Sequence, residues 1–224
     1  MLARPGFALY YSEAGGEKVP YLVYVPKNYD PAKAMPVVVF LHGAILARDN
    51  YYHHTDPSIA DEPVFSVADM YNTLVIFPFG KAGFAWPAQY AANENILKMI
   101  EQVKERYNVN SKKVFLGGIS MGGSGTYWFI NNKAQQFAGF YTFSGMPQEL
   151  KLSNITTERP LYTLNSKDDP GCPYSEIYGF YQKHQNETKG WHIESVETGG
   201  HRFIYNPGGQ KYVQQIIGAL LKTH

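Results

Sequence analysis

The sequence predicts an α/β fold, with helices on both faces of a doubly wound and mostly parallel sheet. Two observations lead to this prediction. Short runs such as 37–41 and 74–77 are continuously apolar, which is typical of strands that are buried on both faces. Amphipathic segments of helical period, such as 93–107, lie between these runs. Strands that alternate with helices at this spacing favour a parallel sheet with helical crossovers.

The composition predicts that residues 1–224 form a single domain with a sizeable core, because 44% of them are hydrophobic. Twenty basic and 19 acidic side chains leave a net charge of +1, which argues against a nucleic-acid partner held by a basic surface. The longest apolar runs fall far short of the roughly 20 residues of a membrane helix, so no membrane partner is expected. Cys172 is the only cysteine, which excludes an intramolecular disulfide.

Seven runs are expected to form strands, of which the first one or two pair antiparallel. The expected strands are 21–25, 37–41, 74–77, 113–116, 140–143, 161–164 and 191–196. The expected helices are 93–107, 127–130, 174–184 and 212–221. Asn93 is the expected N-cap of the first helix. Only about 17 residues separate the fifth strand from the sixth, too few for a large helical cap.

One segment carries the strongest signal for chemistry. Gly118, Ser120 and Gly122 form a G-x-S-x-G pattern directly after the strand 113–116, which is typical of a nucleophile elbow. Glycines two residues on either side of the serine let the neighbouring chains approach without a Cβ clash. The serine hydroxyl is then exposed at the carboxyl end of the sheet, where α/β sites form. The alternatives are a structural turn or a phosphate loop, although the lysine of a P-loop is absent.

A serine hydroxyl needs a nearby base in order to act as a nucleophile. Among the seven histidines, His201 is the best candidate, because it follows the last expected strand and comes directly after Gly199 and Gly200. An acid then has to orient the imidazole, and the loop after the sixth expected strand offers Asp168 and Asp169. We favour Asp169 and keep Asp168 as the alternative.

Three further positions complete the expected site. The backbone N–H groups of Met121 and Ala44 are the expected donors to an oxyanion, because one follows the serine and the other follows the strand 37–41. Trp86 lies in a loop after the strand 74–77, where it can stack on an aryl or sugar group of a substrate, with burial in the core as the alternative. No metal site is expected, because the adjacent His53 and His54 rarely converge on one ion.

The chain resembles the α/β-hydrolase superfamily, and within it the small esterases similar to the polyhydroxybutyrate-depolymerase and feruloyl-esterase group. The segments that carry the resemblance are 24–26, 37–43, 107–110, 113–123, the loop that contains Asp168 and Asp169, and Gly199 to His201. The resemblance places the nucleophile, acid and base on Ser120, Asp169 and His201, and the oxyanion donors on Ala44 and Met121. One departure bears on the acid: many relatives have His-Gly before it, whereas this chain has Asn165-Ser166.

The resemblance implies a serine carboxylesterase that hydrolyses small acyl or aryl esters, of the acetyl or feruloyl type, through an acyl-enzyme. No cofactor is expected, and the substrate would be a small-molecule or polysaccharide-linked ester. The alternatives are a peptidase or aminoacyl hydrolase on the same fold, and a non-catalytic binding member. The sequence does not indicate the oligomeric state. Residues 1–10 lack an apolar run of signal-peptide length, so the compartment stays open between cytoplasmic and secreted with the signal removed.

Overall fold

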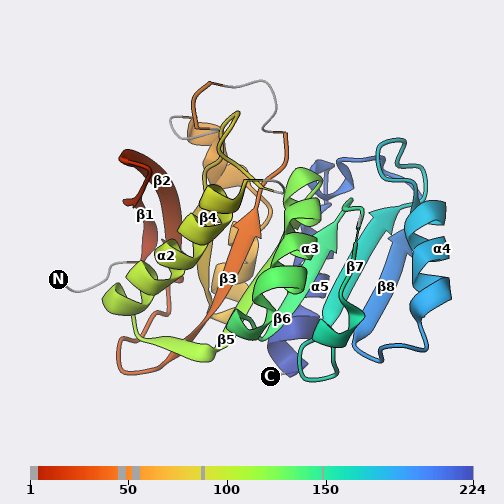
Figure 1. Ribbon diagram of the computed structural model, residues 1–224. Coiled ribbons are helices and arrows are strands. Elements are labelled where there is room, and N and C mark those ends of the chain that lie inside the picture. The colour runs from red at the N-terminus through yellow and green to blue at the C-terminus, as the bar shows by residue number, and fades with distance from the viewer. Residues whose placement is uncertain (1–4, 45–48, 52–55, 87–88, 148, 224) are drawn as a thin grey trace.

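The computed structural model describes residues 5–44, 49–51, 56–86, 89–147 and 149–223. Its centre is an eight-stranded sheet in the order β1-β2-β4-β3-β5-β6-β7-β8 (Figure 1). The strands are β1 Gly6–Ala14, β2 Glu17–Val25, β3 Met35–Leu41, β4 Leu74–Pro78, β5 Val109–Ile119, β6 Gly139–Phe143, β7 Leu161–Ser166 and β8 Trp191–Val196. β1 and β2 form an antiparallel pair, β2 also runs antiparallel to β4, and β3 to β8 are parallel.

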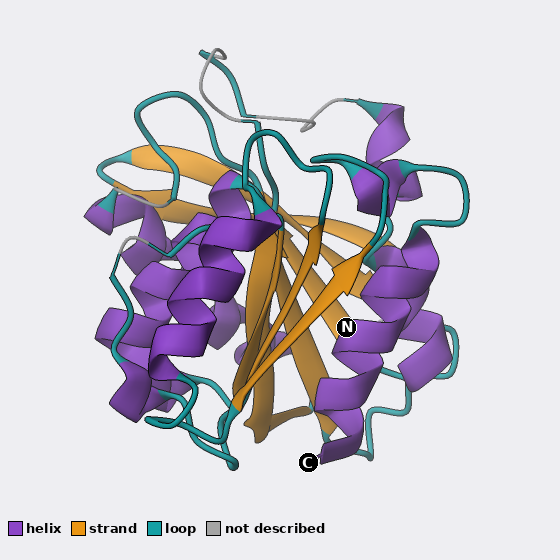
Figure 2. Cartoon of the chain, turned by 90° about the vertical axis from the view of Figure 1, so that its right-hand side faces the viewer, coloured by secondary structure: helices purple, strands orange, loops and turns teal. Residues whose placement is uncertain are grey.

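Helices cover both faces of the sheet (Figure 2). They are α1 Phe65–Tyr71, α2 Tyr90–Arg106, α3 Met121–Lys133, α4 Tyr174–His184 and α5 Gln210–Thr223. α2, α3 and α4 lie over one face, and α1 and α5 lie over the other. None of these helices is both long and apolar enough to cross a bilayer.

The two faces of the sheet explain why the strands are apolar at every position. In β3, Val37, Val39 and Leu41 belong to the core beneath α2 and α3, whereas Val38 and Phe40 belong to the core beneath α1 and α5. Each of these five side chains is fully buried. Consecutive residues of a strand point to opposite faces, so a sheet with two covered faces needs apolar residues throughout.

The seven expected strands are all confirmed, although most extend further than expected. The expected N-cap is wrong: α2 begins earlier, at Tyr90, with Gln89 in the cap position. Asn93 instead lies inside the helix and is fully buried. The periodic apolar residues begin only at Ile96, so the pattern did not reveal the first turn of the helix.

Two elements were not expected from the sequence. The edge strand β1 pairs only with β2, and its residues alternate between exposed and partly buried over most of its length. The helix α1 has seven residues and no side-chain cap at its N-terminus. Such short or half-exposed elements give weak periodic signals.

The segment between β6 and β7 is short, as expected, and its described part places no α-helix over the carboxyl edge of the sheet. In its described part, 144–147 and 149–160, the only helical piece is the 3₁₀ turn Leu152–Asn154. The described chain therefore contains no helical cap between these strands. Because β3 to β8 are parallel, the loops that follow them gather at this edge, where α/β folds build their sites.

Candidate active site

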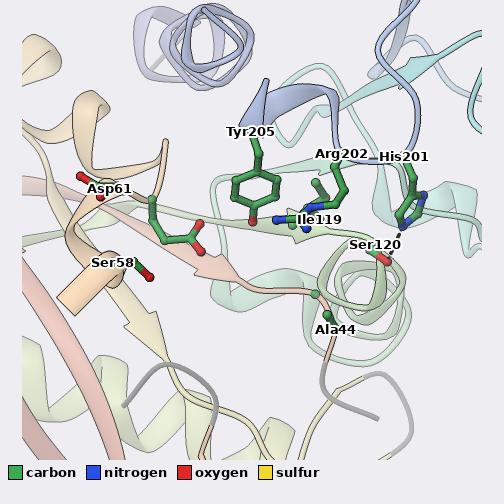
Figure 3. Close-up of a pocket in the computed structure, with 10 residues that line it drawn as sticks. Ala44, Ser58, Asp61, Ile119, Ser120, His201, Arg202 and Tyr205 are labelled. Carbon is green, nitrogen blue, oxygen red and sulfur yellow. Dashed lines mark hydrogen bonds between the residues drawn. The ribbon is translucent and has the colours of Figure 1, made fainter. Parts of the chain in front are cut away.

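The serine of the expected elbow lies on a strained turn between β5 and α3. Ser120 has φ 56° and ψ −117°, a backbone conformation that L residues rarely adopt. Both flanking glycines are required, because a Cβ on Gly118 or Gly122 would come 2.1 Å or 1.8 Å from the carbonyl oxygen of Leu41. The Ser120 side chain is directed towards His201 (Figure 3).

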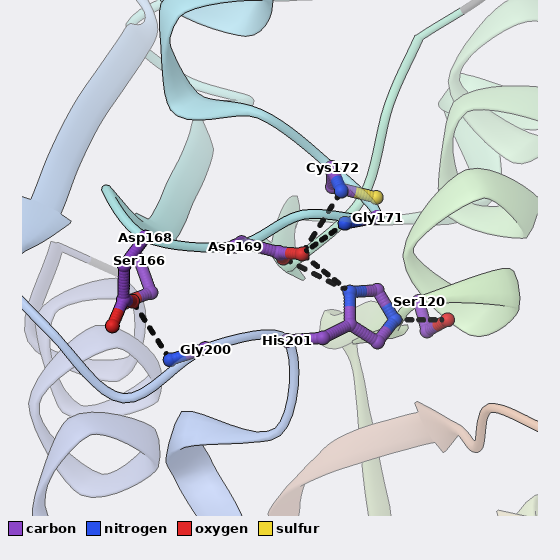
Figure 4. A network of polar contacts seen from close by, with 8 residues as sticks. All are labelled: Ser120, Ser166, Asp168, Asp169, Gly171, Cys172, Gly200 and His201. Carbon is purple, nitrogen blue, oxygen red and sulfur yellow. Dashed lines mark hydrogen bonds and ion pairs between the residues drawn. The ribbon is translucent and has the colours of Figure 1, made fainter.

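His201 links the serine to an acid. Its Nε2 lies 2.7 Å from the Ser120 Oγ, and its Nδ1 lies 2.9 Å and 3.0 Å from the two carboxylate oxygens of Asp169 (Figure 4). The three residues follow β5, β7 and β8, and are brought together only by the parallel sheet. The imidazole is about one-third exposed, whereas the Asp169 side chain is fully buried. A buried carboxylate on Nδ1 fixes the tautomer in which Nε2 accepts the serine proton.

The Asp169 carboxylate is also held by backbone donors. Its Oδ1 accepts hydrogen bonds from the N–H groups of Gly171 at 2.8 Å and Cys172 at 2.9 Å. Burial works to raise the pKa of Asp169, but the hydrogen bonds from Cys172, His201 and Gly171 outweigh it and hold the pKa below its usual value. The acid is therefore ionised at neutral pH and can stabilise an imidazolium.

Asp168, the alternative acid, has a different set of partners. It accepts hydrogen bonds from the N–H groups of Gly200 at 2.8 Å and Gly199 at 3.2 Å, and from the Ser166 hydroxyl. Figure 4 shows its carboxylate turned away from the His201 ring. Asp168 thus anchors the loop that carries the histidine, and the contact with the imidazole is made by Asp169.

The two expected oxyanion donors lie on either side of the serine. Met121 is the first residue of α3, where backbone N–H groups have no acceptor within their own helix. Ala44 lines the same hollow as Ser120 and adopts the left-handed φ of 56°. Their role as donors stays a prediction.

The expectation that Trp86 contacts the substrate is wrong in this structure. Its side chain is only 2% exposed, and it packs against α3 at Gly125, where a Cβ would come 2.6 Å from the Trp86 Cβ. Its Nε1 donates a hydrogen bond to the backbone carbonyl of His42 (2.8 Å). The large ring fills the space beside a glycine, so Trp86 braces the strand end that precedes Ala44.

A cluster of possible metal ligands overlaps the site. Asp169, Cys172 and His201 place one ligand atom each within 4.8 Å of one another. The aspartate and the histidine already bond to each other, and burial raises the pKa of the Cys172 thiol to about 11. A metal ion at this cluster would have to displace the proton of a buried thiol and compete with the contact between Asp169 and His201. His53 and His54 lie outside the described residues.

Two hollows meet at Ser120 and His201. The first, which we call the Arg202 pocket, has a volume of about 360 Å³. It is lined by Gly43, Ala44, Ser58, Asp61, Glu62, Ile119, Ser120, His201, Arg202 and Tyr205. The second, the Trp128 groove, has a volume of about 850 Å³. Besides Ser120 and His201, its lining includes Met121, Ser124, Trp128, Met146 and Leu150. Together they give an ester room on both sides of its carbonyl carbon.

Sequence reasoning did not identify the polar residues of the Arg202 pocket. Arg202 and Tyr205 come soon after His201 in the chain, and this closeness to the expected base could have marked them as residues of the site. Glu62 gave no signal in the sequence, because it is far from the elbow, the acid and the histidine along the chain. It follows the 3₁₀ turn Pro57–Asp61, and only the tertiary structure brings it to the site.

Known proteins with related sequence or structure include several esterases. A bifunctional acetylxylan esterase/xylanase of Neocallimastix patriciarum is 28% identical over 167 residues, which cover 74% of this chain. The match covers only 23% of that relative's length. A thermostable esterase superposes with a TM-score of 0.73 at 21% identity, over 96% of this chain and 62% of the other. A ferulic acid esterase gives 0.71 at 14% identity, over 97% of both chains.

The fold and the sequence match agree. The solved structures share the topology at low identity and therefore establish the α/β-hydrolase fold. The family described as putative esterase matches residues 12–154, more than half of the chain and including the serine elbow. On this match, the chain belongs to the putative esterase family, with the α/β-hydrolase fold.

Proposed function

We propose that this protein is a serine carboxylesterase that hydrolyses small acyl or aryl esters through an acyl-enzyme. The observation that carries the proposal is the chain of hydrogen bonds from Ser120 through His201 to Asp169, at 2.7 Å and 2.9 Å. This is the geometry that an activated serine requires. Membership of the putative esterase family supports the same reaction.

In the first half of the reaction, the Ser120 Oγ attacks the acyl carbon while His201 Nε2 takes its proton. The carbonyl oxygen becomes an oxyanion, and the backbone N–H groups of Met121 and Ala44 stabilise it. Asp169 stabilises the imidazolium. The carbon–oxygen bond to the alcohol then breaks, and His201 returns the proton to the leaving oxygen, which departs as the free alcohol.

In the second half, water takes the place of the alcohol. His201 accepts a proton from this water as its oxygen attacks the acyl carbon of the acyl-enzyme. The bond to the Ser120 Oγ breaks, the proton passes to that oxygen, and the carboxylic acid leaves. Each turnover consumes one ester and one water, and the scheme needs no cofactor.

The proposed substrates are acetyl- and feruloyl-type esters, either of small alcohols or linked to polysaccharide. The name of the acetylxylan esterase/xylanase relative supports an acetyl ester, and that of the ferulic acid esterase neighbour supports an aryl acid. The lack of a helical cap in the described segment between β6 and β7 supports access by an ester attached to a larger chain.

The test compares hydrolysis of 4-nitrophenyl acetate and methyl ferulate by the parent, by Ser120→Ala and by Ser175→Ala. Ser175 is exposed on α4, away from both hollows, and is the matched control. We expect Ser120→Ala to lower kcat by roughly 10⁴-fold or more, with the control unchanged. Undiminished turnover by Ser120→Ala refutes the proposal, and peptide turnover faster than ester turnover would favour a peptidase.

A further inference from the structure

The two hollows at Ser120 differ in size and in the side chains that line them. The Trp128 groove is the larger hollow and has a mixed wall, in which apolar side chains (Met121, Trp128, Met146 and Leu150) lie beside polar ones (Ser124, Asn131, Asn132, Glu149 and Lys151). The Arg202 pocket has Ser58, Asp61, Glu62, Arg202 and Tyr205, which all offer hydrogen-bonding groups. The pocket volume of about 360 Å³ lies at the lower end of the range of small-ligand sites.

The Arg202 pocket is built around a buried acid. Glu62 is 8% exposed and nevertheless lines the pocket. Burial raises the pKa of Glu62 to about 7, and a hydrogen bond with Tyr205 and the charge of Arg202 oppose this shift. The Arg202 guanidinium lies over the Tyr205 ring, 5.1 Å from its centre. Figure 3 shows Arg202 and Tyr205 side by side above the pocket, with Asp61 and Ser58 on the opposite wall.

The charges of the pocket do not favour an anion. Arg202 contributes one positive charge, Asp61 contributes one negative charge, and Glu62 is partly ionised at neutral pH. The net charge thus lies between zero and minus one. Carboxyl groups accept hydrogen bonds from hydroxyls, a guanidinium donates to oxygen, and a tyrosine hydroxyl does both. This combination matches a neutral group with several hydroxyls.

The position of the pocket relates it to the alcohol part of the ester. His201, which lines both hollows, has to deliver a proton to the leaving oxygen, and Arg202 and Tyr205, which come soon after it in the chain, line only the Arg202 pocket. A group attached to that oxygen can therefore extend along Arg202 and Tyr205. The apolar side chains of the Trp128 groove, Met121, Trp128 and Met146, then remain for the acyl group.

We propose that the Arg202 pocket binds a polyhydroxylated alcohol, such as a sugar ring, through Glu62, Arg202 and Tyr205, while the acyl group lies in the Trp128 groove. This inference rests on the proposed serine esterase activity and adds to it the residues that select the alcohol. Glu62, Arg202 and Tyr205 are then specificity residues, which touch the alcohol and take no part in the proton transfers.

The test keeps the acyl group constant and changes the alcohol. The probes are a methyl xylopyranoside carrying one acetyl group and cyclohexyl acetate, which has a ring of the same size without hydroxyls. The variants are Arg202→Gln and Tyr205→Phe. The matched controls are Lys211→Gln and Tyr212→Phe, because Lys211 also lies over a tyrosine ring, at 4.8 Å, but outside both hollows. Thermal unfolding verifies that each variant is folded.

We expect Arg202→Gln and Tyr205→Phe to lower the ratio of kcat/KM for the sugar ester to kcat/KM for cyclohexyl acetate about tenfold or more. The controls should leave this ratio within twofold of the parent. Repeating the pair with feruloyl in place of acetyl should give the same change, because the effect belongs to the alcohol.

Three results would overturn the inference. They are a ratio that the Arg202 and Tyr205 variants leave unchanged, an effect that follows the acyl group instead of the alcohol, and a parent that cleaves cyclohexyl acetate but not the sugar ester. Failure of the underlying activity gives a different result. In that case Ser120→Ala would hydrolyse both esters as fast as the parent, or the parent would hydrolyse neither.

Discussion

At the scale of single residues, two consecutive aspartates have separate tasks. Asp169 is buried and contacts the imidazole of His201, whereas Asp168 is exposed and holds the backbone of Gly199 and Gly200. In the proposed mechanism, Asp169 governs the tautomer and charge of the His201 imidazole. Asp168 governs the place of the loop from which the base projects.

This division predicts that Asp169→Asn lowers kcat much more than Asp168→Asn does. Asp169→Asn removes the charge that faces the imidazolium, and should lower kcat for 4-nitrophenyl acetate by roughly 10⁴-fold. Asp168→Asn keeps one acceptor oxygen and should cost about tenfold through a less ordered loop. Steady-state kinetics on both variants measures the difference. A larger loss in Asp168→Asn than in Asp169→Asn would transfer the role of the acid to Asp168.

The sequence singled out Ser120 because the elbow motif is local, and His201 because its glycine loop follows a strand, and the structure brings these two side chains into contact. The choice of Asp169 over Asp168 depended on the register of the loop before Pro173; in the structure Asp169 contacts the imidazole, and its role as the acid stays a prediction. Trp86 was misplaced, because a loop position does not reveal whether a large ring folds back onto the core. Glu62 could not be found, since no motif marks it.

At the scale of elements, the turn from β5 into α3 depends on close contact with the end of β3. A Cβ added to Gly118 or Gly122 would lie 2.1 Å or 1.8 Å from the carbonyl oxygen of Leu41. A Cβ on Gly123 would lie 3.0 Å from the Cα of Gly145, after β6, which is a looser but still close approach. The elbow is therefore fixed by the neighbouring strands as much as by its own backbone, and a small side chain at these positions would displace the serine.

We therefore expect Gly122→Ala to lower both the stability and the activity of the protein. The added Cβ would lie 1.8 Å from a backbone oxygen that cannot move alone, so we expect a loss of about 2 kcal/mol or more in the free energy of unfolding, together with most of the activity. Gly179→Ala on α4 is the matched control, because its Cβ meets nothing within 4 Å. The control should be neutral or stabilising by up to about 1 kcal/mol. Urea unfolding measures both, and equal stabilities would contradict this view of the elbow.

The central strands and the helices α4 and α5 were predictable because burial imposes continuous or periodic apolar residues on them. β1 and α1 were not, since β1 has a partner on one edge only and α1 is held by its packing on α5 and the sheet. Local sequence signals are weak where tertiary contacts decide the structure.

At the scale of the whole molecule, the buried Glu62 makes stability depend on pH. The pKa of its carboxyl is about 7 in the folded protein, against the ordinary value of 4.5, with burial as the cause and Tyr205 and Arg202 acting against it. Between these two values the folded state binds more protons than the unfolded state. Stability is therefore lost as the pH rises from about 4.5 to 7.

Glu62→Gln should remove this loss. Relative to the variant, we expect the parent to lose up to about 3 kcal/mol in the free energy of unfolding between pH 5 and pH 8. The surface variant Glu105→Gln, on the exposed side of α2, should keep the pH dependence of the parent. Urea unfolding at four pH values gives the comparison. Parallel curves for the parent and Glu62→Gln would show that the acid titrates at its ordinary pKa.

The neighbouring parallel strands β5 to β8 bring together Ser120 after β5, Asp169 after β7 and His201 after β8. The central claim is that this assembly makes Ser120 a nucleophile. Reaction with an alkyl fluorophosphonate tests it most directly, because the attacking oxygen displaces fluoride and keeps the phosphonyl group. The account predicts one phosphonyl group per chain, located on Ser120 by mass spectrometry of peptide 114–133 and absent in Ser120→Ala. A label on another residue, or ester hydrolysis that continues in a chain whose Ser120 is fully labelled, would contradict it.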